Sequence, residues 1–539
     1  MSNIKVITII IIILIATATR LLFLGQFPNG FTGDEAEQGY SAYSLLRTGK
    51  DEWGQFLPLF PRGFGDYKPP LYTYLTIPPV AIFGLTVEAV RIPAAVAGIL
   101  SVVVVYFLTK ELLKDEKIAL WSSFLLAISP WHIQLSRTAW EGGIGILTFS
   151  LGLLFYLKSR NRDLIFAAIF WGLTLYSYHS WRIFVALFIA ALLFLGRKKL
   201  SAKNNLSAGL VLLIFILPLV INLNSVLARS SDVSIFSEQQ ISGYFENKGV
   251  NPLPPILDKL LDNKILFGLN QFSGNYLSYY SPFFYFSGNR PDNTYLNFPY
   301  FPLVYLIELI FWLVAIYVLI SQKVANRNVI ILWAVLAAVP AALATGSMNA
   351  NRAPTFLPLI SLISALGVNY LINKWKPATG IILAGLALSF IVFLHFYLFT
   401  LPQRPPDNLR YNYGTVFKRV LELEGSYDQI VISKAFTEPQ IFIAFYGKAD
   451  PKVFQEASKD WLRYEKSGKH YLDQMESWNL GKFLFEGINW EKKDSLRNNA
   501  LIVSKAEDFP SDIESIFDFK DQKGKIIYRI VSVKNDEKN

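Results

Sequence analysis

The chain has 539 residues, of which 52% are hydrophobic and only 17% are charged, whereas soluble domains carry roughly 25% charged residues. This composition indicates a membrane protein. The formal net charge is +10, but residues 401–539 contain 22 basic and 22 acidic residues, so the whole excess precedes them. We attribute the excess to cytoplasmic loops rich in Lys and Arg, which excludes a nucleic-acid-binding function. The absence of Cys excludes disulfides and thiolate metal sites.

Apolar runs fill the first 400 residues, and a membrane-spanning helix needs about 20 such residues. With the N-terminus in the cytoplasm, five short loops rich in Lys or Arg, as cytoplasmic loops are, read KELLKDEK, LKSRNRD, GRKKLSAK, SQKVANR and NKWK. A cleaved signal ending at the ATA of residues 16–18 is the alternative for the first run, but that run resumes after Arg20. We predict about eleven spans, at residues 4–24, 89–113, 118–135, 144–157, 164–178, 183–195, 206–223, 300–320, 329–345, 354–372 and 380–400.

The opposite, extracytoplasmic face then holds residues 25–88, residues 222–299, three short turns and the C-terminal part. Within that C-terminal part the segments DQIVIS, NALIVSK and KIIYRIVSV alternate apolar and polar residues in the manner of strands. We therefore expect two domains: a polytopic α-helical membrane domain at residues 1–400 and a small extracytoplasmic α/β domain at residues 401–539.

Two adjacent acids, Asp34 and Glu35, stand in the outer segment FTGDEAEQGYSAYSLL, directly after the first span. A capping role is one interpretation, because Thr32 and Glu35 have the spacing of a capping box, and Asp34 could itself be the N-cap. Apolar and aromatic residues then recur at helical spacing, which predicts an amphipathic helix lying along the membrane surface. These residues are Ala36, Tyr40, Tyr43 and Leu46.

The same outer segment continues with FGDYKPPLYTYL, in which Asp66 and Lys68 precede two prolines. Prolines end regular structure and stiffen the chain, so we expect Lys68 to be held near the membrane interface. The alternative role for this lysine is snorkelling toward lipid headgroups.

Three short outer turns each carry a single arginine: Arg137 with Glu141, Arg182 with His179, and Arg352. Cations are disfavoured on the outer face, so each arginine requires an anionic partner, either an outer acid or a ligand. A guanidinium group suits phosphate oxygens, and a carboxylate can deprotonate an acceptor. Together these residues predict a transfer site at the membrane surface.

These segments resemble the GT-C membrane glycosyltransferases, specifically the branch of the protein O-mannosyltransferases and the aminoarabinose transferases that act on lipid A. The resemblance covers residues 4–372 and is most specific at GDEAEQGYSAYSLL and FGDYKPPLYTYL. It implies a polyprenyl-phosphate sugar donor and a multi-pass protein of the plasma (inner) membrane. It also implies an active site on the extracytoplasmic face, with an acidic base in the first outer loop.

Asp34 matches that catalytic base, and Glu35 is expected to orient the acceptor or the base. Lys68 occupies the lysine position of the family and is expected to contact the donor phosphate, with Arg352 and Arg182 as further phosphate contacts. The aminoarabinose transferases place an acid directly before this lysine, whereas here Tyr67 stands there. Possible substrate-binding residues are Asp66, Tyr67, Arg137, Glu141 and His179.

The implied reaction is an inverting transfer of the sugar to a hydroxyl group of a protein Ser or Thr, a lipid or a glycan. We expect no cofactor, because no two His residues have zinc-site spacing, although Asp34, Glu35 and Glu141 could together hold Mg²⁺ or Mn²⁺. A transporter or flippase of lipid-linked sugars is the alternative, but it would need charge near the midplane, where Glu308 is the clearest ionisable residue. A noncatalytic scaffold is a third alternative.

Overall fold

The computed structural model describes residues 3–64, 66–158, 162–195, 202–246, 263–291, 300–404, 410–467, 475–491 and 499–534, with isolated positions at 254, 256, 257 and 260. Two of the predicted cytoplasmic loops, at 157–163 and 196–203, lie partly outside these ranges, as does much of the predicted outer segment 222–299.

The chain folds into two compact units, each built from two separate stretches of sequence. The first unit contains Met1–Leu24 and Pro93–Thr400, and the second contains Gly25–Ile92 and Leu401–Asn539. The outer segment at residues 25–92 therefore packs with the C-terminal part. The domain boundary at residue 400 stays a prediction.

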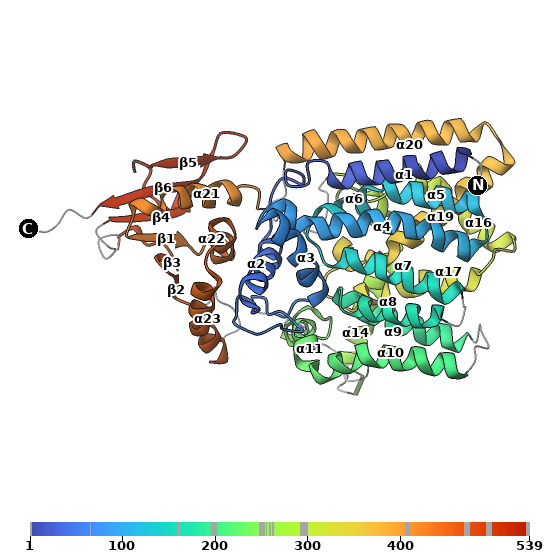
Figure 1. Ribbon diagram of the computed structural model, residues 1–539, viewed down its shortest axis with the longest axis horizontal. Coiled ribbons are helices and arrows are strands. Elements are labelled where there is room, and N and C mark those ends of the chain that lie inside the picture. Colours follow the sequence, from blue (N-terminus) through green and yellow to red (C-terminus); the bar gives the residue numbers. More distant parts are fainter. Residues whose placement is uncertain are drawn as a thin grey trace, which may run out of the picture. The chain divides into compact units, whose positions relative to one another are not determined.

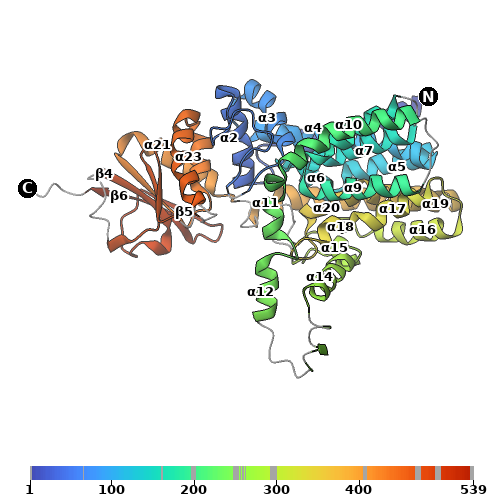
Figure 2. The same ribbon diagram turned by 90° about the horizontal axis from the view of Figure 1, so that it is seen from below.

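Long apolar helices form the first unit, and every predicted span overlaps one of them (Figure 1). In the described parts of the chain between α10 and α16 lie the helices α11, α12, α14 and α15, and α12 extends away from the long helices (Figure 2). The long helices and their short neighbours are α1 (Asn3–Leu21), α4 (Val87–Leu113), α5 (Glu116–Ile128), α6 (Pro130–Arg137), α7 (Gly142–Lys158), α8 (Asp163–Leu175), α9 (His179–Phe194), α10 (Ala202–Ile221), α16 (Glu308–Ser321), α17 (Arg327–Ala337), α18 (Val339–Ala342), α19 (Leu357–Lys374) and α20 (Ala378–His395). The connecting helices are α11 (Leu223–Val233), α12 (Glu238–Glu246), α14 (Lys264–Ser278) and α15 (Pro282–Phe286).

Among the described residues, four helices are long and apolar enough to cross a membrane: Asn3–Leu21, Val87–Leu113, Pro354–Lys374 and Ala378–Gln403. A fifth candidate is the pair α5 and α6, which is bent by 57°. The remaining predicted spans coincide with shorter apolar helices. A membrane protein is thus confirmed in outline, and the number of about eleven crossings stays a prediction.

The bend between α5 and α6 has a local cause, because Pro130 is the first residue of α6 and cannot continue the hydrogen bonding of α5. The carbonyl groups at the end of α5 then lack helical partners. Arg20, which is fully buried, donates to two of them, Leu126 at 3.1 Å and Ala127 at 2.9 Å. A buried arginine of α1 thereby stabilises the break.

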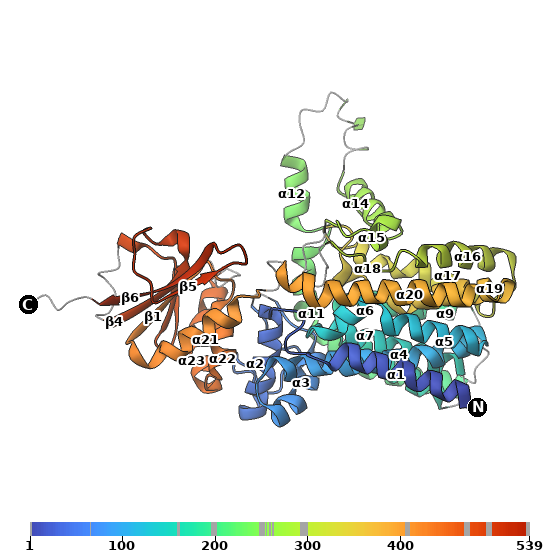
Figure 3. The same ribbon diagram turned by 90° about the horizontal axis from the view of Figure 1, so that it is seen from above.

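A six-stranded mixed sheet with helices forms the C-terminal part of the second unit, in the strand order β2-β3-β1-β4-β6-β5. The predicted strands are confirmed as β1 (Gln429–Ser433), β4 (Asn499–Lys505) and β6 (Ile526–Lys534), and β1 runs parallel to both β3 and β4. Helices α21, α22 and α23 lie together on one face of the sheet (Figure 3). The other elements are β2 (Ser477–Leu480), β3 (Phe483–Glu486), β5 (Phe517–Lys520), α21 (Tyr413–Leu423), α22 (Pro439–Gly447) and α23 (Pro451–Lys466).

The outer segment contributes α2 (Gly33–Thr48) and α3 (Pro70–Phe83) to this unit. The helix predicted after Asp34 is confirmed as α2, but its apolar face packs on protein. Tyr40 is fully buried, lies 5.1 Å from the ring of Phe454, and donates its hydroxyl group to the carbonyl of Ala449 at 3.1 Å. The ring of Phe31 lies 4.7 Å from Phe445. The expectation that this stripe rests on the membrane surface is therefore wrong for Tyr40, because α22 and α23 supply the apolar surface instead.

Candidate active site

The start of α2 fixes the two adjacent acids in different environments. Thr32 is the N-cap, and its hydroxyl group accepts a hydrogen bond from the backbone N–H of Glu35 at 3.2 Å. The carboxylate of Glu35 accepts in return from the backbone N–H of Thr32 at 3.0 Å. The predicted capping box is confirmed, and the alternative with Asp34 as the N-cap is wrong. Asp34 lies in the first turn, where the helix dipole favours a negative charge.

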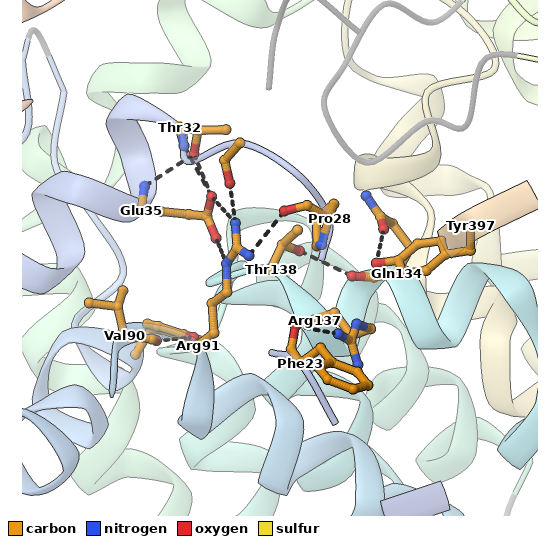
Figure 4. A network of polar contacts seen from close by, with 12 residues as sticks. Phe23, Pro28, Thr32, Glu35, Val90, Arg91, Gln134, Arg137, Thr138 and Tyr397 are labelled. Atoms are coloured by element: carbon orange, nitrogen blue, oxygen red, sulfur yellow. Dashed lines mark hydrogen bonds and ion pairs between the residues drawn. The ribbon is translucent and has the colours of Figure 1, made fainter. Parts of the chain in front are cut away.

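Glu35 is held from its other side by Arg91, and both side chains are fully buried (Figure 4). Arg91 donates from Nε to Glu35 at 2.8 Å and from a terminal nitrogen at 3.2 Å. The same guanidinium group donates to the carbonyls of Pro28 at 3.2 Å and Gly30 at 2.5 Å. This ion pair joins α4 to the loop that leads into α2. The expected role of Glu35 in orienting the acceptor or the base stays a prediction.

A tight reversal of the chain at residues 61–68 brings Lys68 to α2. The backbone N–H of Lys68 donates to the carbonyl of Pro61 at 2.8 Å, and that of Gly63 donates to the carbonyl of Asp66 at 2.8 Å. A Cβ atom at Gly63 would lie only 2.5 Å from a carboxylate oxygen of Asp66 and 2.8 Å from one of Glu37. A side chain at residue 63 would therefore displace these carboxylate groups, whereas glycine lets the backbone approach them closely.

The ammonium group of Lys68 lies among carboxylates. Its Nζ is 2.6 Å from Asp34 Oδ1, 3.5 Å from Glu37 Oε2 and 3.7 Å from Asp66 Oδ1. The Lys68 side chain is only 9% exposed, whereas that of Asp34 is 42% exposed. Of the three acids near Lys68, Asp34 is thus the one that solvent or a substrate can readily reach.

The sequence analysis missed the carboxyl groups of two buried residues, Glu37 and Glu52. Glu37 is buried, and its Oε1 has no hydrogen-bond partner among the described residues. Glu52 is fully buried and accepts from the hydroxyl group of Ser41 at 2.6 and 2.7 Å. Burial raises the pKa of Glu52 to about 8 and the pKa of Glu37 well above its usual range. The i, i+3 spacing of Asp34 and Glu37 was the available signal, because it places both on one face of α2.

Glu438, at the start of α22, is the third carboxyl group that the sequence analysis missed. Its Oε2 lies against α2, only 2.2 Å from the position that a Cβ atom at Gly33 would take. Burial raises the pKa of Glu438 to about 7; the negative charges of Asp34 and Asp66 contribute in the same direction, and the positive charge of Lys68 opposes them. The C-terminal part of the chain thus carries a carboxyl group to the Asp34 and Lys68 pair.

Tyr67, predicted to contact substrate, faces Arg62, whose guanidinium group lies 5.7 Å from the Tyr67 ring and 5.3 Å from that of Trp53. Arg62 also forms an ion pair with Glu465 of α23. These contacts fasten the reversal at residues 61–68 to the C-terminal part of the chain.

Within the first unit, Arg137 is buried and donates to three carbonyl groups at the end of α1: Thr19 at 2.8 Å, Leu22 at 2.9 Å and Phe23 at 3.0 Å. Figure 4 shows the contact with Phe23. The expectation that this arginine requires an anion overlooked such carbonyls, which also attract a cation at a helix C-terminus. Glu141 is buried next to Trp140. Roles for Arg137 and Glu141 in substrate binding stay predictions.

The structure brings together the other predicted residues of this unit. A guanidinium nitrogen of Arg182 lies 3.0 Å from Nδ1 of His179, and Nε of Arg182 donates to the carbonyl of Leu175 at 3.0 Å. His179 and Arg352 line one cavity of about 240 Å³, together with Tyr178, Ser180, Ile183, Val233, Ser234, Pro340, Leu343 and Ala344. Arg352 also donates to the carbonyl of Thr345. Apart from these two basic residues the cavity is lined by one tyrosine and by apolar and small polar side chains.

Metal ligation receives no specific support from the geometry. Across the described ranges, no group of three or more His, Cys, Asp or Glu residues is arranged to hold a metal ion. Glu35, one of the acids considered for Mg²⁺ or Mn²⁺, has its carboxylate engaged by Arg91 and Thr32.

Comparisons with known proteins agree with the resemblance. Residues 67–221 match the family model described as dolichyl-phosphate-mannose-protein mannosyltransferase. A search of curated protein sequences finds no match to the chain. Among solved structures, ArnT from Cupriavidus metallidurans is 10% identical, with a TM-score of 0.54 and 98% of each chain covered. This similarity extends over both units and shows a shared fold.

Two other matches are weaker. The oligosaccharyltransferase AglB from Archaeoglobus fulgidus is 15% identical, with a TM-score of 0.48 over 82% of this chain, and the chain spans 63% of its length. The S. cerevisiae protein O-mannosyltransferase Pmt1-Pmt2 complex is 16% identical, with a TM-score of 0.31, and the match covers 47% of this chain and 38% of the other.

The family match over residues 67–221 and the fold shared with ArnT confirm the predicted resemblance to the GT-C membrane glycosyltransferases and the predicted enzyme class, a glycosyltransferase.

Proposed function

We propose that the protein transfers a sugar from a polyprenyl-phosphate donor to an acceptor hydroxyl group, with inversion at the anomeric carbon. In this proposal Asp34 is the general base and Lys68 binds the donor phosphate. The reaction takes place on the extracytoplasmic face of the plasma (inner) membrane, and the acceptor is a protein Ser or Thr, a lipid or a glycan.

The observation that carries the proposal is the pairing of Lys68 with Asp34 at 2.6 Å. The ammonium group has fixed surroundings, since its side chain is 9% exposed and two further acids adjoin it. Asp34 is its more exposed partner. A donor phosphate can therefore replace Asp34 on Lys68 and leave the Asp34 carboxylate beside the bound sugar, where a base is needed.

The chemistry requires few other groups. The acceptor oxygen attacks the anomeric carbon while its proton passes to Asp34, and the bond from that carbon to the phosphate oxygen breaks. The leaving polyprenyl phosphate is already an anion of low basicity, so it needs no general acid of the kind used by glycosidases. Lys68 stabilises the charge that develops on it, and losing such a preplaced charge typically costs a factor of about 100 to 1000.

The class of donor is supported by the comparisons at the level of fold and family. A structure of ArnT from Cupriavidus metallidurans contains undecaprenyl phosphate, and the matching family model is named for a dolichyl-phosphate-mannose donor. Further contacts of the donor phosphate with Arg352 and Arg182 belong to this proposal, as does the orientation of the chain in the membrane.

The test is release of polyprenyl phosphate by the purified protein, with dolichyl-phosphate mannose labelled in the lipid as the first probe donor. We expect Asp34→Asn and Lys68→Ala each to reduce turnover, measured per folded molecule, at least about 100-fold. The matched control is Lys459→Ala. Like Lys68, Lys459 forms an ion pair with an acid, but it is exposed on α23 and its partner Glu456 lies one helical turn away.

Normal turnover in Asp34→Asn would exclude Asp34 as the base. Movement of intact donor across a proteoliposome membrane, with no release of lipid phosphate under any condition, would favour the transporter alternative.

A further inference from the structure

Glu438 has an unusual backbone conformation. Its φ and ψ angles are 51° and 48°, in the left-handed region that residues with a side chain rarely adopt. The following residue, Pro439, is the first residue of α22. Non-glycine residues in this conformation carry a local energetic cost and are held there by the surrounding structure, often at functional sites. The conformation therefore calls for an explanation beyond the start of a helix.

The carboxyl group of Glu438 is directed to the first turn of α2. Its Oε2 would be 2.2 Å from a Cβ atom at residue 33, so any side chain there would displace the end of this carboxyl group. Residue 33 directly precedes Asp34. The left-handed turn before α22 thus places the carboxyl group of Glu438 against the start of α2, beside Asp34.

Five charged or titratable groups interact electrostatically with Glu438, and together they represent every element that adjoins it. Asp34 and Glu37 come from α2, Asp66 and Lys68 from the reversal at residues 61–68, and Arg410 from the segment before α21. Acids outnumber bases in this group. The charge on Glu438 therefore changes the net charge around Lys68, which already lies within 3.7 Å of three carboxylates.

We propose that Glu438 is a positioning residue that controls donor binding: in its neutral form it leaves Lys68 to the donor phosphate, and in its ionised form it competes with that phosphate for Lys68. The inference rests on the proposed function, since it assumes that Lys68 binds the donor. Burial raises the pKa of Glu438 to about 7, so this residue changes between its neutral and ionised forms near neutral pH.

The direction of the effect follows from charge. The donor is a phosphodiester and keeps one negative charge through the neutral range, so its own ionisation does not change. As the pH rises through about 7, Glu438 becomes an anion, repels the donor phosphate and attracts Lys68. We expect the affinity for donor to fall about tenfold between about pH 6 and about pH 8, as one additional close charge in a protein environment implies.

The experiment measures binding of dolichyl-phosphate mannose to the full-length protein in detergent at these two pH values. We expect the affinity of Glu438→Gln for the donor to fall clearly less between the two pH values than that of the unmodified protein, because only the titration of Glu37 and Glu52 near Lys68 then remains. Glu438→Asp keeps a titratable carboxyl group and is expected to retain the pH dependence. Glu456→Gln, at an exposed position of α23, is the matched control and should follow the unmodified protein.

A Glu438→Gln variant whose affinity falls with pH as steeply as that of the unmodified protein would overturn the inference. Lys68→Ala separates this failure from failure of the proposed function. If Lys68→Ala binds donor normally at the lower pH, the proposed donor site itself is wrong. If Lys68→Ala loses donor binding while Glu438→Gln keeps the full pH dependence, only the role of Glu438 is wrong. Thermal unfolding of each variant verifies that the compared proteins are folded.

Discussion

Replacing Glu35 by alanine distinguishes a positioning role from direct participation in transfer. The substitution removes a carboxylate that is fully buried against the equally buried Arg91. Removing one partner of a buried ion pair typically costs about 3 to 5 kcal/mol, because the other charge is left uncompensated. The variant also loses half of the capping box with Thr32, worth about 0.5 to 2 kcal/mol.

These two losses together amount to about 4 to 7 kcal/mol, a large part of the roughly 5 to 15 kcal/mol that stabilises a folded protein. We therefore expect Glu35→Ala to lower the thermal unfolding temperature markedly and to reduce the yield of folded protein in detergent. The adjacent substitution Asp34→Asn affects a side chain that is 42% exposed, so it should change the free energy of unfolding by less than about 1 kcal/mol.

The assay compares thermal unfolding, followed by intrinsic fluorescence, with release of lipid phosphate per folded molecule. We expect Asp34→Asn to lose activity at unchanged stability, and Glu35→Ala to lose stability while its folded fraction retains activity. The double substitution Glu35→Leu with Arg91→Met should recover part of the stability, because no buried charge then remains unpaired. A Glu35→Ala variant that unfolds normally and is inactive would refute the reasoning, since Glu35 would then take a direct part in transfer.

Three further predictions follow from the same unit and its neighbour. Because the folded-state pKa of Glu52, about 8, exceeds its ordinary value, stability should fall as the pH rises from about 4.5 to about 8, and Glu52→Gln should reduce that loss by about 2 to 4 kcal/mol in unfolding experiments. Gly63→Ala should lower turnover and the unfolding temperature, because its Cβ atom meets Asp66 and Glu37. Arg137→Met should destabilise the first unit by about 1 to 3 kcal/mol in thermal unfolding, since carbonyls at the end of α1 lose their donor.

The helices and strands could be predicted because their signals are local. Each span prediction rested on one predominantly apolar stretch of sequence, and each overlaps a helix of the structure. The strands β1, β4 and β6 were recognised from alternation within single segments. The start of α2 was also predictable, because a capping box joins residues only three positions apart, Thr32 and Glu35.

The surroundings of Lys68 could only partly be predicted, because they depend on contacts between distant segments. Its pairing with Asp34 follows from two motifs of the same outer segment, but Glu438 is hundreds of residues away and no local pattern marks it. The sequence analysis also expected each outer arginine to require an anion. In the structure, Arg137 and Arg182 donate to backbone carbonyls, which a broken or ended helix provides and a hydropathy pattern does not reveal.

The charges around Lys68 imply an order of substrate binding in the proposed reaction. One lysine already faces Asp34, Glu37 and Asp66, so a donor phosphate adds an anion to a cluster with more acids than bases. It can bind well only if a carboxylate gives up its contact with Lys68 or takes up a proton. Asp34 is the exposed member of the cluster, so it is the carboxylate that an incoming phosphate can displace from Lys68. Donor binding would then release the base that the acceptor needs, which requires the donor to bind before the acceptor.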